Sequence, residues 1–379
     1  MGDEARIVGA GQARYSRRPG DDVTTVSLLA DAAASSLADA GLVPADVDGL
    51  AVASFSLAPD RAVDLAFRLG LSLNWLLDAH TGGASGVDML QHARRAVEGG
   101  DADVVLVVAG DRLDPPAFAR LVDEYNTATR DHLAPLPTGG PNALFAMLTT
   151  RHMEEHDLDR SVYGRLAVAQ RAWAAANPNA VYRAPLALDE YLEAPVVADP
   201  LRIYDCVPVV AGADAVVVSG RADGPGARIR AIVASHNADQ QDGDGLVTGL
   251  RALREELWGA AGSSPDEVDV VSVYDDYPAI ALVQLDDLGF TAGGGVRRFV
   301  EERIESRSLP VNTSGGQLSA GQAGAAGGLH GVVEVVRQLR GDAGERQVEG
   351  ARLGLVSGYG MVAYRYGASA NAAVLERVP

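Results

Sequence analysis

The chain has 379 residues, 47% of them hydrophobic and 22% charged, which is enough to bury a large core in one layered domain or in two. Its formal net charge of −19 argues against a nucleic-acid groove or an anionic membrane surface as the binding function. The single cysteine excludes an internal disulfide framework and, with an acidic N-terminus that does not resemble a signal peptide, predicts a cytoplasmic location.

The first elements of the chain recur in its second part. Each copy predicts a strand, then a helix, then a motif Pro-x-acid-Val-Asp-x-aliphatic-x-Val that leads into another strand. The motif reads PADVDGLAV in the first copy and PDEVDVVSV in the second. These elements cover residues 5–9, 23–40 and 44–52, and then residues 229–234, 246–261 and 265–273.

A second set of elements repeats in the same way. Each copy predicts a Gly-rich turn, a helix and an apolar strand, at 80–86, 87–97 and 104–109 and again at 315–328, 332–339 and 353–356. Such repetition indicates a duplicated α/β domain. We place the halves at residues 1–225 and 226–379, on either side of a turn-rich segment, with a helical, polar insertion at about 111–200.

The insertion contains a pair of histidines. His152 and His156 lie four residues apart on one predicted helix, a spacing that could hold a metal ion. No cluster of further ligands lies nearby in the sequence. We therefore interpret the pair as part of a solvated helical face and expect no metal site.

The most informative stretch is residues 312–328, NTSGGQLSAGQAGAAGG, which passes directly into a helix with aliphatic residues on one face. Glycine this dense costs backbone entropy, so a folded chain keeps it where the backbone turns tightly or approaches a ligand closely. A helix that opens from such a loop presents unpaired N–H groups to negative charge on an oxygen. We therefore interpret the stretch as a functional loop rather than a linker.

This loop resembles the Gly-rich loop of thiolases, which carries an Asn, two glycines and then Gly-His-Pro. The sterol-carrier type of thiolase also reads NTSGG. The matching residues are Asn312, Gly315, Gly316, Gly321 and Gly328. Gln322 stands where the family has its His, and Ala323 stands where it has Pro.

Three other segments extend the resemblance over most of the chain. Residues 177–218 resemble the end of the first half of sterol-carrier-type thiolases, and VYDDYPAIALVQLDDLGF (273–290) resembles the segment after their second-half strand. SGYGMVAYRYG (357–367) resembles their C-terminal turn. The resemblance implies an α/β thiolase fold of five layers, αβαβα, with two central helices buried between sheets and with subunits paired as homodimers.

The catalytic residues of thiolases do not carry over. The family places its nucleophilic Cys in a Cys-Ala-Ser-Gly-like run, and here that run begins with Gly83. Ser85, two residues on, is an alternative acyl carrier, although no His-containing motif lies beside it. Cys206 lies in ADPLRIYDC, where relatives have Cys or a small residue away from the site, so we expect it to be a buried structural thiol.

The second family Cys, an acid/base group, corresponds to a position within residues 357–360 whose register the sequence leaves open. Tyr359 lies there between two glycines, so it is either an acid/base group at a strand end or a packing residue. Tyr274 stands where relatives have the Asn or His that helps to hold the oxyanion. A phenol such as Tyr274 and an amide such as Gln322 can both donate to an oxyanion.

The expected site therefore has two parts. The catalytic group is Tyr359, Gln322 and Tyr274, and the oxyanion and loop group is Gly83, Ser85, Asn312, Gly316, Gly321 and Asp276. The adjacent acids Asp275 and Asp276 have an alternative interpretation, in which they only end the strand.

Loss of the Cys removes acyl transfer but leaves enolate stabilisation possible. Retro-aldol cleavage of a β-hydroxyacyl-CoA needs a base on the hydroxyl and a stabilised thioester enolate, with no covalent intermediate. The chain resembles the thiolase-like aldolases of steroid side-chain breakdown, which lack the Cys and use tyrosines as acid/base groups. The resemblance implies a coenzyme A thioester as substrate, no permanently bound cofactor, and a small zinc-ribbon and OB-fold acyl-CoA-binding partner subunit.

Two alternatives stay open at this point. One is a Claisen or other acyl-transfer enzyme that uses an unrecognised group. The other is a catalytically silent thiolase-fold subunit that only completes a heteromeric complex.

Overall fold

The computed structural model describes residues 4–133, 135–136, 140–221, 224–238, 242–363 and 366–379. Its main sheet has nine strands in the order β3-β2-β4-β7-β1-β8-β11-β10-β9. The strands of the first half are β1 (Arg6–Gln12), β2 (Gly49–Ala53), β3 (Trp75–Asp78), β4 (Val104–Asp111) and β7 (Gly212–Ser219). The strands of the second half are β8 (Gly226–His236), β9 (Val270–Ser272), β10 (Leu353–Ala363) and β11 (Tyr366–Val378).

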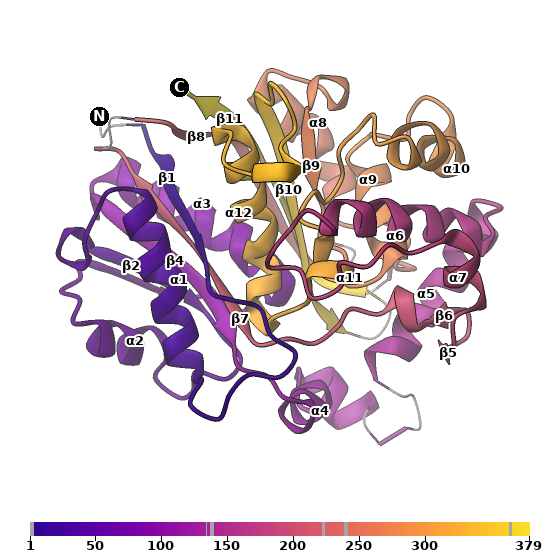
Figure 1. Ribbon diagram of the computed structural model, residues 1–379, viewed down its shortest axis with the longest axis horizontal. Helices are drawn as coiled ribbons and strands as arrows, with labels where there is room; N and C mark the ends of the chain where they lie inside the picture. The colour runs from indigo at the N-terminus through magenta and orange to yellow at the C-terminus, as the bar shows by residue number, and fades with distance from the viewer. Residues whose placement is uncertain (1–3, 134, 137–139, 222–223, 239–241, 364–365) are drawn as a thin grey trace.

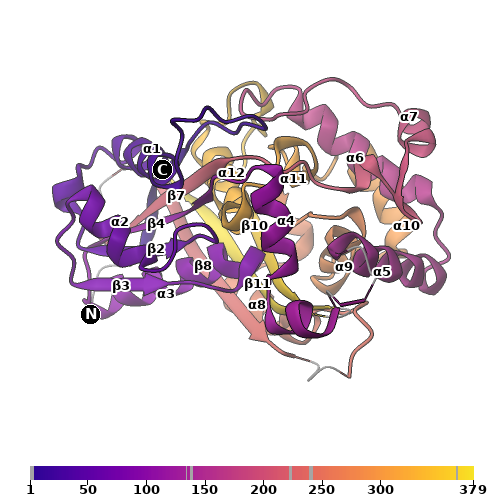
Figure 2. The same ribbon diagram turned by 90° about the horizontal axis from the view of Figure 1, so that it is seen from below.

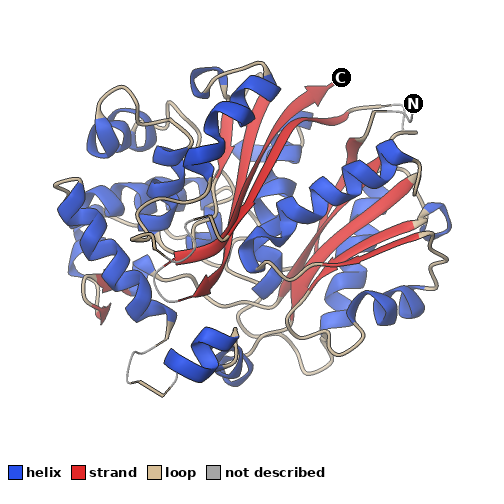
Figure 3. Cartoon of the chain, turned by 180° about the vertical axis from the view of Figure 1, so that it is seen from behind, coloured by secondary structure: helices blue, strands red, loops and turns tan. Residues whose placement is uncertain are grey.

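The two halves repeat one strand pattern. In the first, β2 and β4 are parallel, and β7 and then β1 follow antiparallel. In the second, β9 and β10 are parallel, and β11 and then β8 follow antiparallel. The halves join through a short pairing of Arg6 with Arg228 and of Ile7 with Ala227. Figure 3 shows the strands as two groups with helices between and around them. The predicted duplicated α/β fold is confirmed.

Two helices lie between these groups of strands. They are α3 (Ser85–Gly99) and α12 (Gly327–Arg340), which contact each other and strands of both halves. Gly86 of α3 meets the backbone of Gly328 of α12, and a side chain on Gly86 would overlap it. The glycines at the start of both helices therefore allow the close approach that the Gly-rich sequence predicts. Strands β4 and β7 are buried along their whole length, because helices cover both of their faces.

Outer helices cover the remaining faces of the sheet. In the first half, α1 (Thr25–Asp39) packs on β1, β4 and β7, and α2 (Arg61–Leu69) packs on β2 and β3. Thr24 begins α1 by accepting a hydrogen bond from the backbone N–H of Ser27 (3.0 Å). In the second half, α8 (Leu250–Ala261) packs on β8 and β11. Figure 1 shows α1 on the outside of the first half and α12 inside the molecule.

The insertion crosses over to the second half. Its α5 (Pro141–Glu155) and α6 (Arg160–Ala174) pack on α9 (Pro278–Asp287), and α6 also contacts α11 (Gly316–Ala320) in the Gly-rich loop. The smaller elements of the insertion are α4 (Pro115–Asp123), the π-helix Thr129–Leu133, α7 (Leu188–Glu193), β5 (Val196–Ala198) and β6 (Leu201–Arg202). The helix α4 lies at the lower edge of Figure 1 and near the middle of the view from below (Figure 2).

A further short helix, α10 (Gly295–Phe299), is continued by the π-helix Val300–Glu305. In the part of the chain that the structure describes, none of the helices combines the length and the apolar character needed to cross a bilayer.

Candidate active site

A cavity of about 560 Å³ lies beneath the insertion, where the start of α3, the segment after β9 and the Gly-rich loop meet. Most of its wall is apolar, and the insertion supplies much of it. The larger apolar side chains in the wall are Phe55, Phe118, Leu121, Val122, Leu133, Leu136, Leu144, Phe145, Val207 and Val362. Its polar side chains are Asp123, Tyr125, Thr129, Asn142, Cys206, Tyr274, Asp276, Tyr277 and Gln322. A mostly apolar cavity with a few convergent polar groups is typical of a small-molecule site.

The cavity contains the position of the missing nucleophile. Gly83 lines it, and a Cβ added to Gly83 would overlap ring atoms Cε2 and Cζ of Tyr274 and the carbonyl oxygen of Tyr359. The phenol ring of Tyr274 therefore occupies the space into which a cysteine side chain at residue 83 would extend. The cysteine side chain and the tyrosine ring would occupy the same space, so the protein can hold only one of them there.

The structure brings Tyr274 and Gln322 together, as the sequence predicts. Gln322 Nε2 donates a hydrogen bond to the Tyr274 hydroxyl (3.0 Å), so the phenol proton remains available to a ligand. Gln322 is itself held through its backbone, which donates to Pro208 O (2.9 Å) and accepts from Val210 N (3.1 Å). Burial, and then the nearby Asp276 carboxylate, raise the pKa of Tyr274 well above its ordinary value. Tyr274 is consequently a neutral hydrogen-bond donor near neutral pH.

The two adjacent acids have different environments. Asp275 faces the protein interior and accepts a hydrogen bond from Gln317 N (2.9 Å) at the start of α11, while burial raises its pKa to about 7. Asp276 lines the cavity, and its Oδ1 is buried without a hydrogen-bond partner among the described residues. Burial, and then Asp275, raise the pKa of Asp276 to about 8. Asp275 is therefore a structural group, whereas Asp276 is part of the cavity wall.

The remaining predicted loop residues shape the backbone around the cavity without lining it. Asn312 is buried with a left-handed φ of 52°, and its Oδ1 accepts a hydrogen bond from Val273 N (2.9 Å). Gly316, at φ 59°, leaves room for the Asp275 carboxylate, which a Cβ there would overlap. Gly321, at φ 113°, packs against Val210. The NTSGG sequence thus fixes the path of the loop that presents Gln322.

Neither alternative nucleophile has the environment that acylation requires. The Ser85 hydroxyl is buried at the start of α3, where it accepts a hydrogen bond from Thr81 N (3.1 Å), and it does not line the cavity. Cys206 does line the cavity, with its Sγ 3.7 Å from Asn142 Oδ1. Burial and then Asp205 raise the pKa of the Cys206 thiol to about 12, so it is not a thiolate near neutral pH.

The structure places Tyr359 differently from the expectation. Its ring is 1% exposed and belongs to the core, its hydroxyl accepts a hydrogen bond from Gly367 N, and it does not line the cavity. Successive residues of a strand point to opposite faces, and it is the flanking Gly358 and Gly360 that face Gly83. Tyr359 therefore packs on the face of β10 away from the position of the missing nucleophile.

Two further residues at the site were not identified from the sequence. Tyr125 follows α4 and lines the cavity; burial raises its pKa to about 12, against the effect of a hydrogen bond from the Met361 backbone. Asp111 ends β4 fully buried, and its carboxylate accepts hydrogen bonds from the segment after β2 and from Ala325 N (2.8 Å). The position of Asp111, two residues after the apolar run 104–109, could have indicated it, whereas no sequence pattern indicated Tyr125.

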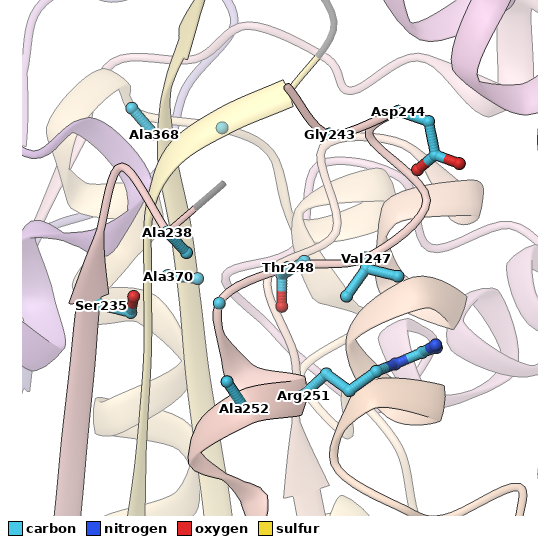
Figure 4. Close-up of a pocket in the computed structure, with 12 residues that line it drawn as sticks. Ser235, Ala238, Gly243, Asp244, Val247, Thr248, Arg251, Ala252, Ala368 and Ala370 are labelled. Carbon is cyan, nitrogen blue, oxygen red and sulfur yellow. The ribbon is translucent and has the colours of Figure 1, made fainter. Parts of the chain in front are cut away.

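A second, smaller hollow of about 310 Å³ lies between the start of α8 and β11 (Figure 4). Among the described residues that line it, Arg251 is cationic and forms ion pairs with Asp286 (2.7 Å) and Asp287 (2.8 Å). None of the predicted site residues lines it. The larger cavity is therefore the candidate active site.

The histidine pair lies in a different environment from the one expected. His152 is buried rather than solvated, since its Nδ1 lies 2.7 Å from the Tyr163 hydroxyl, and burial lowers its pKa to about 3. The expectation of a solvated face is wrong for this residue, because α5 packs His152 against α6. Within the described residues, no group of three potential His, Cys, Asp or Glu ligands has the geometry to hold a metal ion.

The fold and the cavity together define a thiolase-fold protein in which a tyrosine fills the place of the nucleophilic cysteine. Residues 231–377 match the family described as Thiolase C-terminal domain-like. The chain is 32% identical over 365 residues to the 17-hydroxy-3-oxo-4-pregnene-20-carboxyl-CoA lyase of Mycobacterium tuberculosis, covering 90% of this chain and 92% of the relative. The chain therefore belongs to the thiolase superfamily.

Two other comparisons also give aldolases as similar proteins. The chain is 28% identical over 368 residues to the steroid side-chain-cleaving aldolase of Thermomonospora curvata, covering 89% of this chain and 90% of the relative. The solved structure of the Ltp2-ChsH2(DUF35) aldolase is similar with a TM-score of 0.84 and 26% identity, over 98% of this chain and 97% of that one. The predicted resemblance to thiolase-like aldolases is confirmed.

Proposed function

We propose that this chain is a carbon–carbon lyase that cleaves β-hydroxyacyl-CoA thioesters by a retro-aldol reaction, without a covalent acyl-enzyme. The observation that carries the proposal is the Tyr274 ring in the space above Gly83, hydrogen-bonded to Gln322. This arrangement removes the acyl carrier of a thiolase and keeps hydrogen-bond donors in its oxyanion region. The names of two relatives, a CoA-thioester lyase and a side-chain-cleaving aldolase, support the same reaction class.

The site supplies what the reaction needs. When the Cα–Cβ bond breaks, its electrons move toward the thioester carbonyl and create negative charge on that oxygen. The Tyr274 hydroxyl is a neutral donor at the cavity wall and is positioned to hold this oxygen, with Gln322 orienting the phenol. Since the fixed donors are already in place, little reorganisation is required as the charge develops.

We propose an acyl group with a bulky, apolar part such as a steroid ring system. The cavity volume of about 560 Å³ and its wall of phenylalanine, leucine and valine side chains support this choice. The names of both relatives refer to steroids or to a pregnene carboxyl-CoA. The coenzyme A thioester is then the substrate, and no resident cofactor enters the reaction.

The direct test is cleavage of a β-hydroxyacyl-CoA that carries a large apolar β-substituent, measured as release of the ketone or aldehyde and the shortened acyl-CoA. Tyr274→Phe should lower kcat by a factor of about 10² to 10³, as loss of one oxyanion donor does. The intact mass of the chain should stay unchanged after incubation with acetoacetyl-CoA. A stable adduct on Ser85 or Cys206 would favour acyl transfer instead.

We also propose two protein partners and a cytoplasmic location. The similar solved structure is an aldolase named together with a DUF35 protein, which supports a small acyl-CoA-binding subunit for this chain as well. A second copy of the chain is the other partner, supported by large apolar side chains exposed on α2 and β3. If wild type together with the small subunit cleaves no β-hydroxyacyl-CoA and exchanges no α-proton, the chain is a silent subunit.

A further inference from the structure

The retro-aldol step needs a group that removes the hydroxyl proton, and the cavity offers few choices. No Arg, Lys or His is among the described residues that line it. Its titratable side chains are two carboxyls, three phenols and one thiol: Asp123, Asp276, Tyr125, Tyr274, Tyr277 and Cys206. Asp123 is exposed at the end of α4, so Asp276 is the one carboxyl in the enclosed part of the cavity.

Asp276 differs from the other buried acids around the site. Asp111 accepts several hydrogen bonds and Asp275 accepts backbone N–H groups of α11, so both are held as structural acceptors. Asp276, unlike these two, lines the cavity, where its carboxylate accepts the backbone N–H groups of Asp276 and Tyr277 and its Oδ1 has no hydrogen-bond partner in the described part of the chain. Asp276 is half-buried, and its accessible part lies in the cavity wall, where a ligand in the cavity would contact it.

The neighbours of Asp276 leave it available. Tyr277 donates its hydroxyl to Asn142 Oδ1 (2.6 Å), and the Tyr274 hydroxyl accepts a hydrogen bond from Gln322 and keeps its own proton for a ligand. Tyr125 faces the same carboxylate from the insertion, and Cys206 faces it from the segment before β7. With Asp275 on its own segment, these are the titratable groups around Asp276, and none of them is cationic.

We propose that Asp276 is the general base of the retro-aldol step, acting together with the donors Tyr274 and Gln322. The assignment rests on the proposed function. The carboxylate takes the proton of the β-hydroxyl, the oxygen electron pair forms the carbonyl, and the Cα–Cβ electrons pass into the thioester enolate. The proton on Asp276 then returns to Cα, which yields the shortened acyl-CoA and restores the carboxylate. Atoms and charge balance without any co-reactant.

The phenols fit the donor role better than the base role. Burial raises the pKa of Tyr125 to about 12 and that of Tyr274 well above its ordinary value, so a phenolate is scarce near neutral pH. A base is most effective when its conjugate acid has a pKa near the working pH. The carboxyl of Asp276, with its pKa raised to about 8 chiefly by burial, meets this condition.

The test is the pH profile of kcat/KM for wild type and Asp276→Asn, each with the small subunit and the same β-hydroxyacyl-CoA. Wild type should show activity that rises with pH through about 8 before it reaches a plateau. Asp276→Asn should lose a factor of about 10² to 10⁴ in kcat, keep KM within a few-fold, and lose the rising limb. The exposed Asp266→Asn should match wild type throughout.

Other outcomes would contradict the assignment of Asp276 as the general base. Full activity in Asp276→Asn, or a slow variant that keeps the wild-type pH limb, would show that another group is the base. If Asp276→Asn does not fold, the wild-type profile still decides, because a profile without any rising limb excludes a carboxyl as the base. If wild type itself cleaves nothing, the proposed function fails instead.

Discussion

Among single residues, Gly83 has two consequences for the chemistry. It lacks the thiol of a thiolase nucleophile, and it also makes room for the Tyr274 ring. A tyrosine at residue 274 and a side chain at residue 83 cannot both occupy their present positions. The loss of the acyl carrier at residue 83 and the gain of a hydrogen-bond donor at residue 274 are therefore coupled. Introducing a cysteine at residue 83 alone, with Tyr274 still present, should not produce acyl transfer.

Gly83→Ala tests this coupling. Its Cβ would overlap the Tyr274 ring and displace the phenol, so cleavage should fall by a factor of at least about 10². The matched control is Gly99→Ala at the other end of α3, where a Cβ meets only Asp101 Oδ2, at 3.8 Å. That variant should keep full activity and gain about 0.5–1 kcal/mol in helix stability. Unchanged cleavage in Gly83→Ala would show that Tyr274 does not act from its present position.

The pKa of Asp276 also predicts a pH-dependent stability difference. Its folded pKa of about 8 lies above its ordinary value of 3.8, so the folded state binds this proton more tightly than the unfolded state. The stability contributed by protonated Asp276 is complete below about pH 4 and is lost as the pH rises through 8. Asn does not ionise, so Asp276→Asn keeps a neutral side chain at every pH. The Tm of Asp276→Asn minus the Tm of wild type should therefore be larger at pH 8.5 than at pH 5.5. Asp266→Asn, which has a 92% exposed side chain, should show no such trend in the same thermal melts.

Among elements, the strand β10 explains why one predicted catalytic residue was misplaced. The sequence shows that Tyr359 lies near the family's second cysteine, but the face on which it lies depends on the strand register. A shift of one residue moves a side chain to the opposite face. In the structure Gly358 and Gly360 face Gly83, and the Tyr359 ring packs over Gly367 of β11.

Tyr359→Phe should therefore affect stability more than activity. The substitution removes the acceptor of the Gly367 N–H within the β10–β11 pair, which should cost about 1 kcal/mol of unfolding free energy. Cleavage should stay within a few-fold of wild type. Tyr274→Phe should show the opposite pattern in the same urea titrations and rate assays. A loss of 10²-fold or more in Tyr359→Phe, with normal stability, would return the phenol to the catalytic machinery.

At the scale of the whole molecule, the sequence predicted the fold in two steps. Two copies of one strand–helix–motif order predicted a duplicated α/β domain, and the resemblance to thiolases implied the two central helices, which are α3 and α12 in the structure. The resemblance to thiolases placed both Tyr274 and Gln322 in the expected site, but their hydrogen bond to each other was found only in the structure. Tyr125 was not predicted, since the path of the insertion over the second half depends on tertiary packing rather than on local pattern.

The outer edge of the first half has exposed apolar side chains that support the proposed homodimer. The strand β3 ends the sheet, and Leu76 on it is 41% exposed. On the adjacent α2, Phe67 is 84% and Val63 is 60% exposed. A sheet edge beside large exposed apolar side chains is a site for pairing with another chain, and stable dimers of this kind bury upward of ~2,000 Å².

We therefore expect the chain to sediment as a dimer at micromolar concentration, through this edge. The double variant Phe67→Glu with Leu76→Lys should shift the sedimentation coefficient toward that of a monomer, because it places charges within an apolar contact. Val196→Asp, on the exposed β5–β6 hairpin of the insertion, introduces a charge at a 56% exposed valine elsewhere and should leave the dimer intact. A monomeric wild type would contradict the dimer. A double variant that remains dimeric would place the interface on another face.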